Sequence, residues 1–344
     1  MKTRTRFHNI VWLVLALMVS CTHRDDAAVE TFLSTPSSPA LSAIDSLMWQ
    51  QPDSALSCLI AYLDTCGEGM HTVSSVTQYD RHYAQLLLAE LLYKNYCEQT
   101  NRAALRQAVS YLDSLHCTDA ARKVSAVAFL DARAHYINGV GYYERDSVVE
   151  ACKEYLTALE VMETHFEEKE LTGIKAQFMA LAYNHIGEIF SNQFMMESAI
   201  VCFEQALVYC SIRPTSSQGV SNILYRLGKQ YDKLGDKNKA SGYYAKAIEN
   251  MPNQDNLTYR DLCSTKALCD YQLDRGTVQS IDLLKDISLI ALDDDERLTR
   301  FLTIGYIYFA EKYYDSAQLY LEAVYKYDED RVSRIQAANF LRII

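Results

Sequence analysis

Two short runs carry residue types that could do chemistry, and both lack the partners that the chemistry requires. Gly139-Val140-Gly141 has two of the glycines of a dinucleotide-binding loop, but its surroundings are helical in pattern and no strand precedes it. His165-Phe166-Glu167-Glu168 begins like the helix of a zinc protease and lacks the second histidine. The sequence therefore predicts no catalytic residue, no metal site and no cofactor, so the protein is not expected to be an enzyme.

The spacing of the cysteines gives little support for a metal site or a redox site. The chain has ten cysteines, and none of the nine that follow Cys21 belongs to a C-x-x-C pair, which argues against zinc ribbons and thioredoxin-type redox sites. An odd number cannot pair completely within one chain. We expect most of them to be small core residues of helices, while one or two disulfides remain open in an oxidising compartment.

The N-terminus has the pattern of a secretory signal peptide over residues 1–20. Three basic residues precede an apolar run from Ile10 to Val19, which is about half the length of a membrane-spanning helix. An uncleaved N-terminal anchor is the alternative. The segment is excluded from the reasoning about the fold.

The end of this segment resembles a bacterial lipobox. Met18-Val19-Ser20-Cys21 has the branched, small and cysteine positions of the motif, with methionine where leucine is usual. The resemblance implies cleavage before Cys21 and lipidation of this residue, and acyl chains would then anchor the protein in a membrane. The alternative is an ordinary cysteine beside a plain cleavage site. Thr22 in place of an acidic residue favours the outer membrane, with the exposed face undecided, and residues 21–40 are expected to form a flexible tether.

The elements that follow are amphipathic helices in a repeating frame. The clearest unit lies between Ser221 and Gln254, and its small and aromatic positions resemble the tetratricopeptide pattern. The matching residues are Leu224, Leu227, Gly228, Tyr231, Ala240, Tyr244, Ala247 and Pro252. The same frame recurs on both sides, from about residue 135 to about residue 324, with a degenerate unit around Leu268 and Ser280.

Glycine within these helices needs a packing reason, because it costs roughly 1 kcal/mol relative to alanine in a helix interior. Close approach of the two helices of a pair supplies that reason, and the second helix has a small residue at the facing position. The residues expected to pack in this way are Gly139 with Ala151, Gly187 with Ala199, Gly228 with Ala240, and Gly305 with Ala317.

The predicted fold class is all-α, a solenoid of antiparallel helix pairs, and the tetratricopeptide resemblance implies a right-handed superhelix. We expect about six to seven pairs over residues 41–330, with the first helix of a further, incomplete repeat over residues 331–344. A single pair cannot bury its apolar face, so neighbouring pairs must stack and share a core.

The resemblance also implies a binding groove lined by the first helix of each pair, where members of the family hold extended peptides. The implied protein-binding residues are Arg133, Tyr136, Tyr143, Asn184, Glu188, Asn192, Asn222, Tyr225, Lys229, Lys233, Tyr306 and Phe309. Aromatic side chains beside amides could hold a peptide or a glycan.

The charge balance restricts the partners. With 44 acidic and 33 basic residues the net charge is −11, which repels nucleic acid, so we expect none among the partners. The chain as a whole resembles the tetratricopeptide-repeat lipoproteins of Bacteroidetes. This implies a non-catalytic interaction scaffold of the cell envelope, tethered to the membrane by lipid, that binds a protein or peptide. The alternatives are the sensor portion of a longer membrane regulator and a glycan-uptake binding lipoprotein.

Overall fold

The computed structural model describes residues 38–65, 77–97, 102–116, 125–212, 217–252, 257–273 and 294–344. The predicted signal peptide, the predicted lipidation site Cys21, nearly all of the tether and the second half of the degenerate repeat lie outside these ranges. All regular elements of the described part are helices. The chain divides into two compact units, residues Met1–Leu171 and Thr172–Ile344, which are treated separately below.

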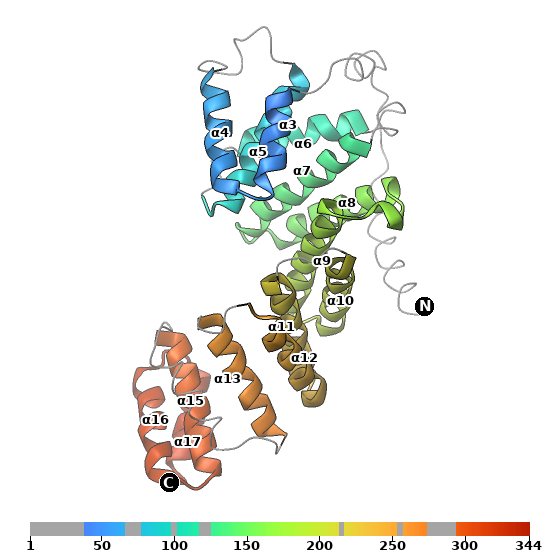
Figure 1. The fold of residues 1–344 in the computed structure, drawn as a ribbon. Coiled ribbons are helices and arrows are strands. Elements are labelled where there is room, and N and C mark those ends of the chain that lie inside the picture. Colours follow the sequence, from blue (N-terminus) through green and yellow to red (C-terminus); the bar gives the residue numbers. More distant parts are fainter. Residues whose placement is uncertain are drawn as a thin grey trace. The chain divides into compact units, whose positions relative to one another are not determined.

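The first unit consists of consecutive helices that pack as neighbours (Figure 1). Proline fits the first turn of a helix because its missing N–H has no partner there, and Pro52 begins the second helix accordingly. Thr77 caps the third helix by accepting a hydrogen bond from the Asp80 N–H at 3.0 Å. The elements are α3 (Pro39–Met48), α4 (Pro52–Thr65), α5 (Gln78–Lys94), α6 (Arg102–His116), α7 (Ser125–Tyr143), α8 (Val148–His165) and the 3₁₀ turn η2 (Glu168–Glu170).

The second unit repeats the helix pair along the chain. The pairs α9 with α10, α11 with α12, and α15 with α16 each pack side by side, and α17 packs on α16 and α15 (Figure 1). The elements are α9 (Ile174–Asn192), α10 (Met196–Ile212), α11 (Ser217–Lys233), α12 (Lys237–Asn250), α13 (Leu257–Gln272), α15 (Asp294–Ala310), α16 (Tyr314–Tyr327) and α17 (Arg331–Leu341).

The turns inside four of the pairs share one backbone conformation. A residue two or three positions after the end of the first helix has a positive φ, and the next N–H bonds to the carbonyl five residues earlier, which is the Schellman arrangement. Only one of the four turns uses glycine for the left-handed position. The residues are Asp146, Phe194, Gly235 and Lys312.

Within these pairs, a glycine of the first helix lies directly against a large side chain of the second. A methyl group added at Gly187 would lie 2.6 Å from the ring of Phe203, and one added at Gly305 would lie 2.7 Å from Leu321. The same contact joins Gly139 to Tyr155 and Gly228 to Tyr244. One turn before each large residue is a fully buried alanine, in chain order Ala151, Ala199, Ala240 and Ala317.

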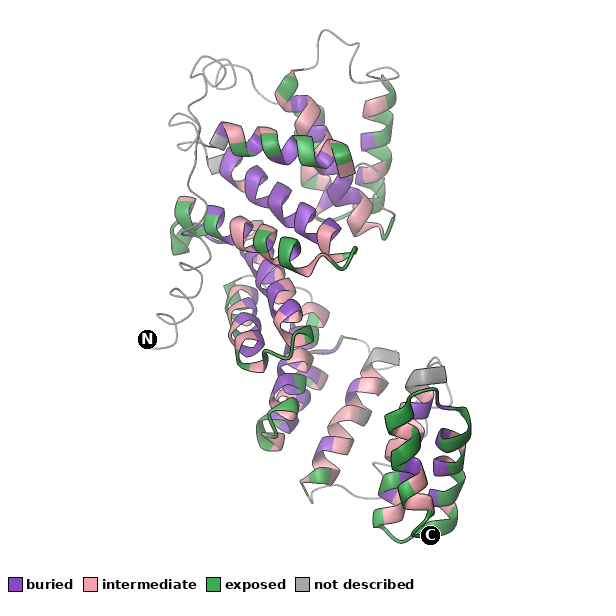
Figure 2. Cartoon of the chain, turned by 180° about the vertical axis from the view of Figure 1, so that it is seen from behind, coloured by how far each residue is buried: buried purple, intermediate pink, exposed green. Residues whose placement is uncertain are grey.

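Burial follows the helix-pair arrangement (Figure 2). Along most helices the inner side is buried and the outer side is exposed. In α7, residues 130–141 are all buried, so this stretch has no exposed side. The seven cysteines of the described part are free thiols, of which Cys58 and Cys97 are exposed and therefore are not core residues. In the described residues, no helix combines the length and the apolar character needed to cross a membrane.

Candidate functional site

The first helices of the second unit are joined to one another by polar side chains. Arg226 of α11 donates from Nη1 to Asn184 Oδ1 at 3.3 Å and forms an ion pair with Glu188, both of α9. One turn further along α11, Gln230 Nε2 donates to Ser191 Oγ at 2.8 Å. These contacts hold α9 and α11 side by side as parts of one surface.

The same surface continues along the unit. Tyr225 of α11 donates its hydroxyl to Asp261 of α13 at 3.2 Å, and Arg300 of α15 forms an ion pair with the same carboxylate. The Tyr271 hydroxyl of α13 donates to Glu311, just beyond α15, at 2.9 Å. We call the surface formed by these contacts on α9, α11, α13 and α15 the first-helix face.

Two lysines give this face an unbalanced positive charge. Lys229 and Lys233 of α11 are exposed and form no ion pair within the described residues. Lys229 Nζ lies 5.4 Å from the ring centre of Tyr225, and Lys233 Nζ lies 5.8 Å from that of Phe194. The acids Glu188 and Asp261 are already paired with arginines, so the lysines remain available to a ligand.

Two titratable groups of the face are held in their neutral forms. Burial, and after it the charge of Arg226, lowers the pKa of His185 to about 4. Burial, and after it the Asp261 carboxylate, raises the pKa of Tyr225 to about 12. At neutral pH the face therefore offers a neutral imidazole and a neutral phenol beside its charged pairs.

The structure separates the predicted groove residues of the second unit into two sets. Tyr306 is exposed and Phe309 is half-buried, and Phe340 of α17 packs on both at ring-centre distances of 5.6 and 5.1 Å. The α15 end of the face is thus partly covered by α17. Among the others, Asn192, Asn222, Lys229 and Lys233 are exposed, while Asn184, Glu188 and Tyr225 are half-buried in the polar contacts of the face.

In the first unit, two of the predicted groove residues belong to the core. Arg133 is 2% exposed and is clamped between Glu90 and Asp45, at 2.5 and 2.8 Å. Tyr136 is buried against Tyr155, with ring centres 5.5 Å apart. The expectation that Arg133 and Tyr136 face an open groove is therefore corrected, because Asp45 of α3 and Glu90 of α5 enclose Arg133 and Tyr155 of α8 packs on Tyr136. Tyr143 is half-buried near the end of the helix.

Three charged residues of the first-helix face were missed by the sequence analysis. Arg226 lies four residues after Asn222 and three before Lys229, so helical periodicity alone places it on the same side of α11. Asp261 and Arg300 had no comparable signal, because the repeat frame is degenerate around α13. Their pairing depends on the packing of α13 against its neighbours.

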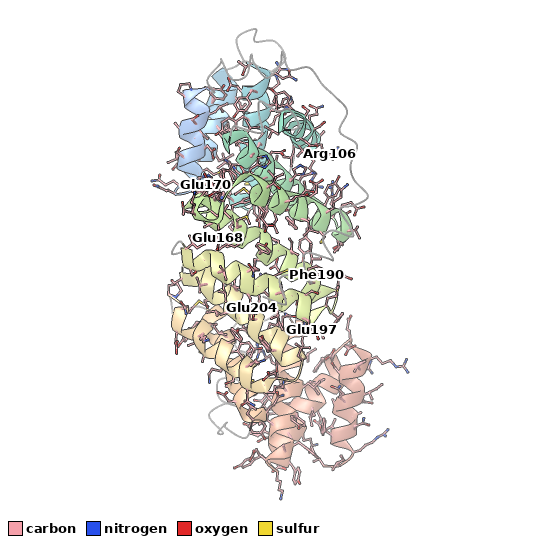
Figure 3. All side chains as sticks on the ribbon, turned by 90° about the vertical axis from the view of Figure 1, so that its right-hand side faces the viewer. Arg106, Glu168, Glu170, Phe190, Glu197 and Glu204 are labelled. Carbon is pink, nitrogen blue, oxygen red and sulfur yellow. The ribbon has the colours of Figure 1, made fainter. Side chains whose placement is uncertain are left out.

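The second helices present a different surface. Glu197 and Glu204 of α10 are exposed and both are labelled in Figure 3. On α12, Lys246 is exposed with its Nζ 5.3 Å from the ring centre of Tyr243, a second-helix counterpart of the lysine–tyrosine pair on α11. This counterpart provides a control position away from the first-helix face.

Comparison with known proteins agrees with the repeat geometry. The family model for the tetratricopeptide repeat matches residues 180–207, 221–254 and 300–331. A search of curated proteins found no match. Among solved structures, the apo form of RapI shares 12% identity with a TM-score of 0.58, covering 88% of this chain and 79% of its own. A Rap protein complexed with Competence and Sporulation Factor shares 15% identity with a TM-score of 0.54, covering 88% and 78%.

The fold is therefore an all-α solenoid that contains tetratricopeptide repeats, and the predicted fold class is confirmed. The three matched stretches contain three of the four packing glycines, Gly187, Gly228 and Gly305. The likeness to the Rap structures concerns the fold.

Proposed function

We propose that this protein is a non-catalytic scaffold that binds a peptide or protein on the first-helix face of its second unit. The observation that carries the proposal is the pair of exposed lysines on α11, Lys229 and Lys233, beside exposed Asn192 and Asn222. Amide side chains can pair with the N–H and C=O groups of an extended peptide. The lysines favour a segment that carries acidic side chains.

The arrangement of the face supports this assignment. Its acids Glu188 and Asp261 are each paired with an arginine, which leaves Lys229 and Lys233 to meet an incoming carboxylate. The polar contacts between successive first helices fix the helices before binding, which lowers the ordering cost of association. A similar fold occurs in a Rap protein that was solved in complex with Competence and Sporulation Factor.

The test is a charge reversal with a matched control. The full chain carries a photo-crosslinking residue in place of Asn222 and is expressed in its native host, and the crosslinked partners are identified by mass spectrometry. Lys229→Glu should weaken capture of the partner by about tenfold or more, as expected for loss and reversal of a contact worth over 1 kcal/mol. Lys246→Glu makes the same change beside a tyrosine on a second helix and should leave capture unchanged.

Equal loss from both substitutions would point to general electrostatics and would contradict a site on the first-helix face. Undiminished capture by the Lys229→Glu variant would also contradict it. Circular dichroism of each variant shows whether the helices are retained, and both lysines are exposed, so folding should be unaffected.

We further propose that the scaffold is anchored in the bacterial cell envelope through lipid on Cys21, on the outer membrane. The proposal rests on the sequence Val19-Ser20-Cys21 after a basic and apolar segment. Cys21→Ala should release the protein from the membrane fraction, with Cys58→Ala as the matched control. Membrane association that survives Cys21→Ala would count against lipidation.

A further inference from the structure

A group of potential metal ligands lies between α6 and α7 in the first unit, whereas the first-helix face belongs to the second unit. Asp131 and His135 are one helical turn apart on α7, so their side chains lie on the same side of the helix. Asp113 approaches from α6, and one carboxylate oxygen of each aspartate and one ring nitrogen of His135 all lie within 4.8 Å of one another. Asp131 is fully buried, His135 is 8% exposed and Asp113 is exposed, so the group is open to solvent on one side only.

The imidazole of His135 is oriented by a fourth side chain. Its Nδ1 lies 2.6 Å from Oε2 of Glu154 on α8. A carboxylate is only an acceptor, so Nδ1 must carry a proton and donate it. This is the arrangement in which a carboxylate fixes the tautomer of a metal-ligating histidine and increases the basicity of its other nitrogen.

The other nitrogen, Nε2, points into the group. It makes no hydrogen bond within the described residues, and Oδ1 of Asp131 lies 3.8 Å from it. That distance is too long for a hydrogen bond. It is close to the separation of roughly 3.4 Å expected for two ligands that are each about 2.1 Å from a tetrahedral ion.

A cation is the occupant that this geometry favours. In the neutral imidazole with its proton on Nδ1, the Nε2 lone pair faces a carboxylate oxygen, and two acceptors in a buried place repel unless a cation lies between them. Asp113 lies on the solvent side of the group, which leaves room for a water as a further ligand. One imidazole and two carboxylates suit zinc and its first-row neighbours rather than copper(I) or iron–sulfur chemistry.

We propose that Asp113, Asp131 and His135 bind one divalent transition-metal ion of the zinc type, with Glu154 as the residue that positions the histidine. The bound ion would join α6 to α7, and through Glu154 to α8. This departs from the sequence-based expectation of no metal. The site is independent of the proposed peptide-binding face, so either proposal can fail without the other.

The experiment is a titration of the full chain, free of any affinity tag and treated with chelator, with Zn²⁺ alone as the probe. Calorimetry should show that the wild type binds one equivalent of Zn²⁺. Asp113→Ala, which changes an exposed residue and should fold normally, is expected to weaken binding at least tenfold. Glu154→Gln should weaken it by about 10–100-fold without removing a ligand. Asp64→Ala, which removes an exposed aspartate from α4, should bind like the wild type.

A second readout excludes binding by the free thiols. Co²⁺ held by nitrogen and oxygen ligands absorbs in the visible without the charge-transfer absorption of a thiolate complex, so its spectrum identifies the ligand type. A thiolate spectrum, or Asp113→Ala binding as tightly as Asp64→Ala, would overturn the proposal. A wild-type protein that binds no single equivalent of Zn²⁺ would also overturn the proposal. In that case a proton on His135, and not a metal ion, lies between His135 and Asp131.

Discussion

Substitution of Gly228 by alanine tests how the helix pairs are held together. In an ordinary helix this change stabilises by roughly 1 kcal/mol, because alanine is the better helix former. Here the added methyl would lie within 2.5 Å of Cδ1 of Tyr244, whose side chain is fully buried and cannot swing away. Forcing such a group into a packed core costs about 1–3 kcal/mol. The net expectation is a loss of roughly 1 kcal/mol.

Gly242 provides the matched control, because it lies in α12 of the same helix pair and a methyl there would meet nothing within 4 Å. Gly242→Ala should therefore stabilise by about 1 kcal/mol. Urea unfolding followed by circular dichroism measures both variants, and the difference between them isolates the steric cost. In a Tyr244→Ala background the Gly228→Ala penalty should disappear. Equal stability of the two glycine variants in the wild-type background would refute the close-packing argument.

Three further substitutions have defined outcomes in the same unfolding assay. Arg133→Met should cost about 3–5 kcal/mol, because it removes the cation paired with the buried Glu90 and the half-buried Asp45, and a loss below 1 kcal/mol would show that the cluster is hydrated. Ser221→Ala should cost about 1–3 kcal/mol, since its buried hydroxyl donates to a backbone carbonyl of α12 at 2.7 Å, and no change would mean that this carbonyl finds another donor. His185 has a pKa of about 4 when folded and about 6.5 when unfolded, so the unfolded chain binds the extra proton and stability falls as the pH drops from about 6.5 to about 4. The loss of stability is at most roughly 3 kcal/mol, and the nearby Glu188 carboxylate reduces it. His185→Gln should remove this pH dependence. A variant whose stability changes with pH as the wild type's does would contradict this role of His185.

The repeat frame was predictable from the sequence because it depends on local spacing. A glycine in a helix interior is costly, so its recurrence at Gly187, Gly228 and Gly305 indicates a close contact between the two helices of each pair. The turns were less predictable. Phe194 and Lys312 occupy left-handed positions that favour glycine, and the hydrogen bonds of the folded turn accompany this conformation.

The candidate site was predicted only in part, because the family pattern gives the direction of a side chain and not what covers it. The exposed amides and lysines on α11 follow from helical periodicity. The burial of Arg133 does not, because it requires Asp45 of α3 and Glu90 of α5 to pair with it, and these are the helices whose repeat pattern is weakest. The pairing of Asp261 with Arg300 likewise joins residues 39 positions apart through a degenerate repeat.

The sequence by itself determined the helical class, the helix pairs and the packing glycines, because all three depend on residues within one pair. The tertiary structure alone decided which polar residues are exposed, which acids are neutralised, and that Asp113, Asp131 and His135 converge. The physical reason is that burial and charge pairing are set by neighbouring helices, and a single helix pattern contains no information about the side chains that pack against it.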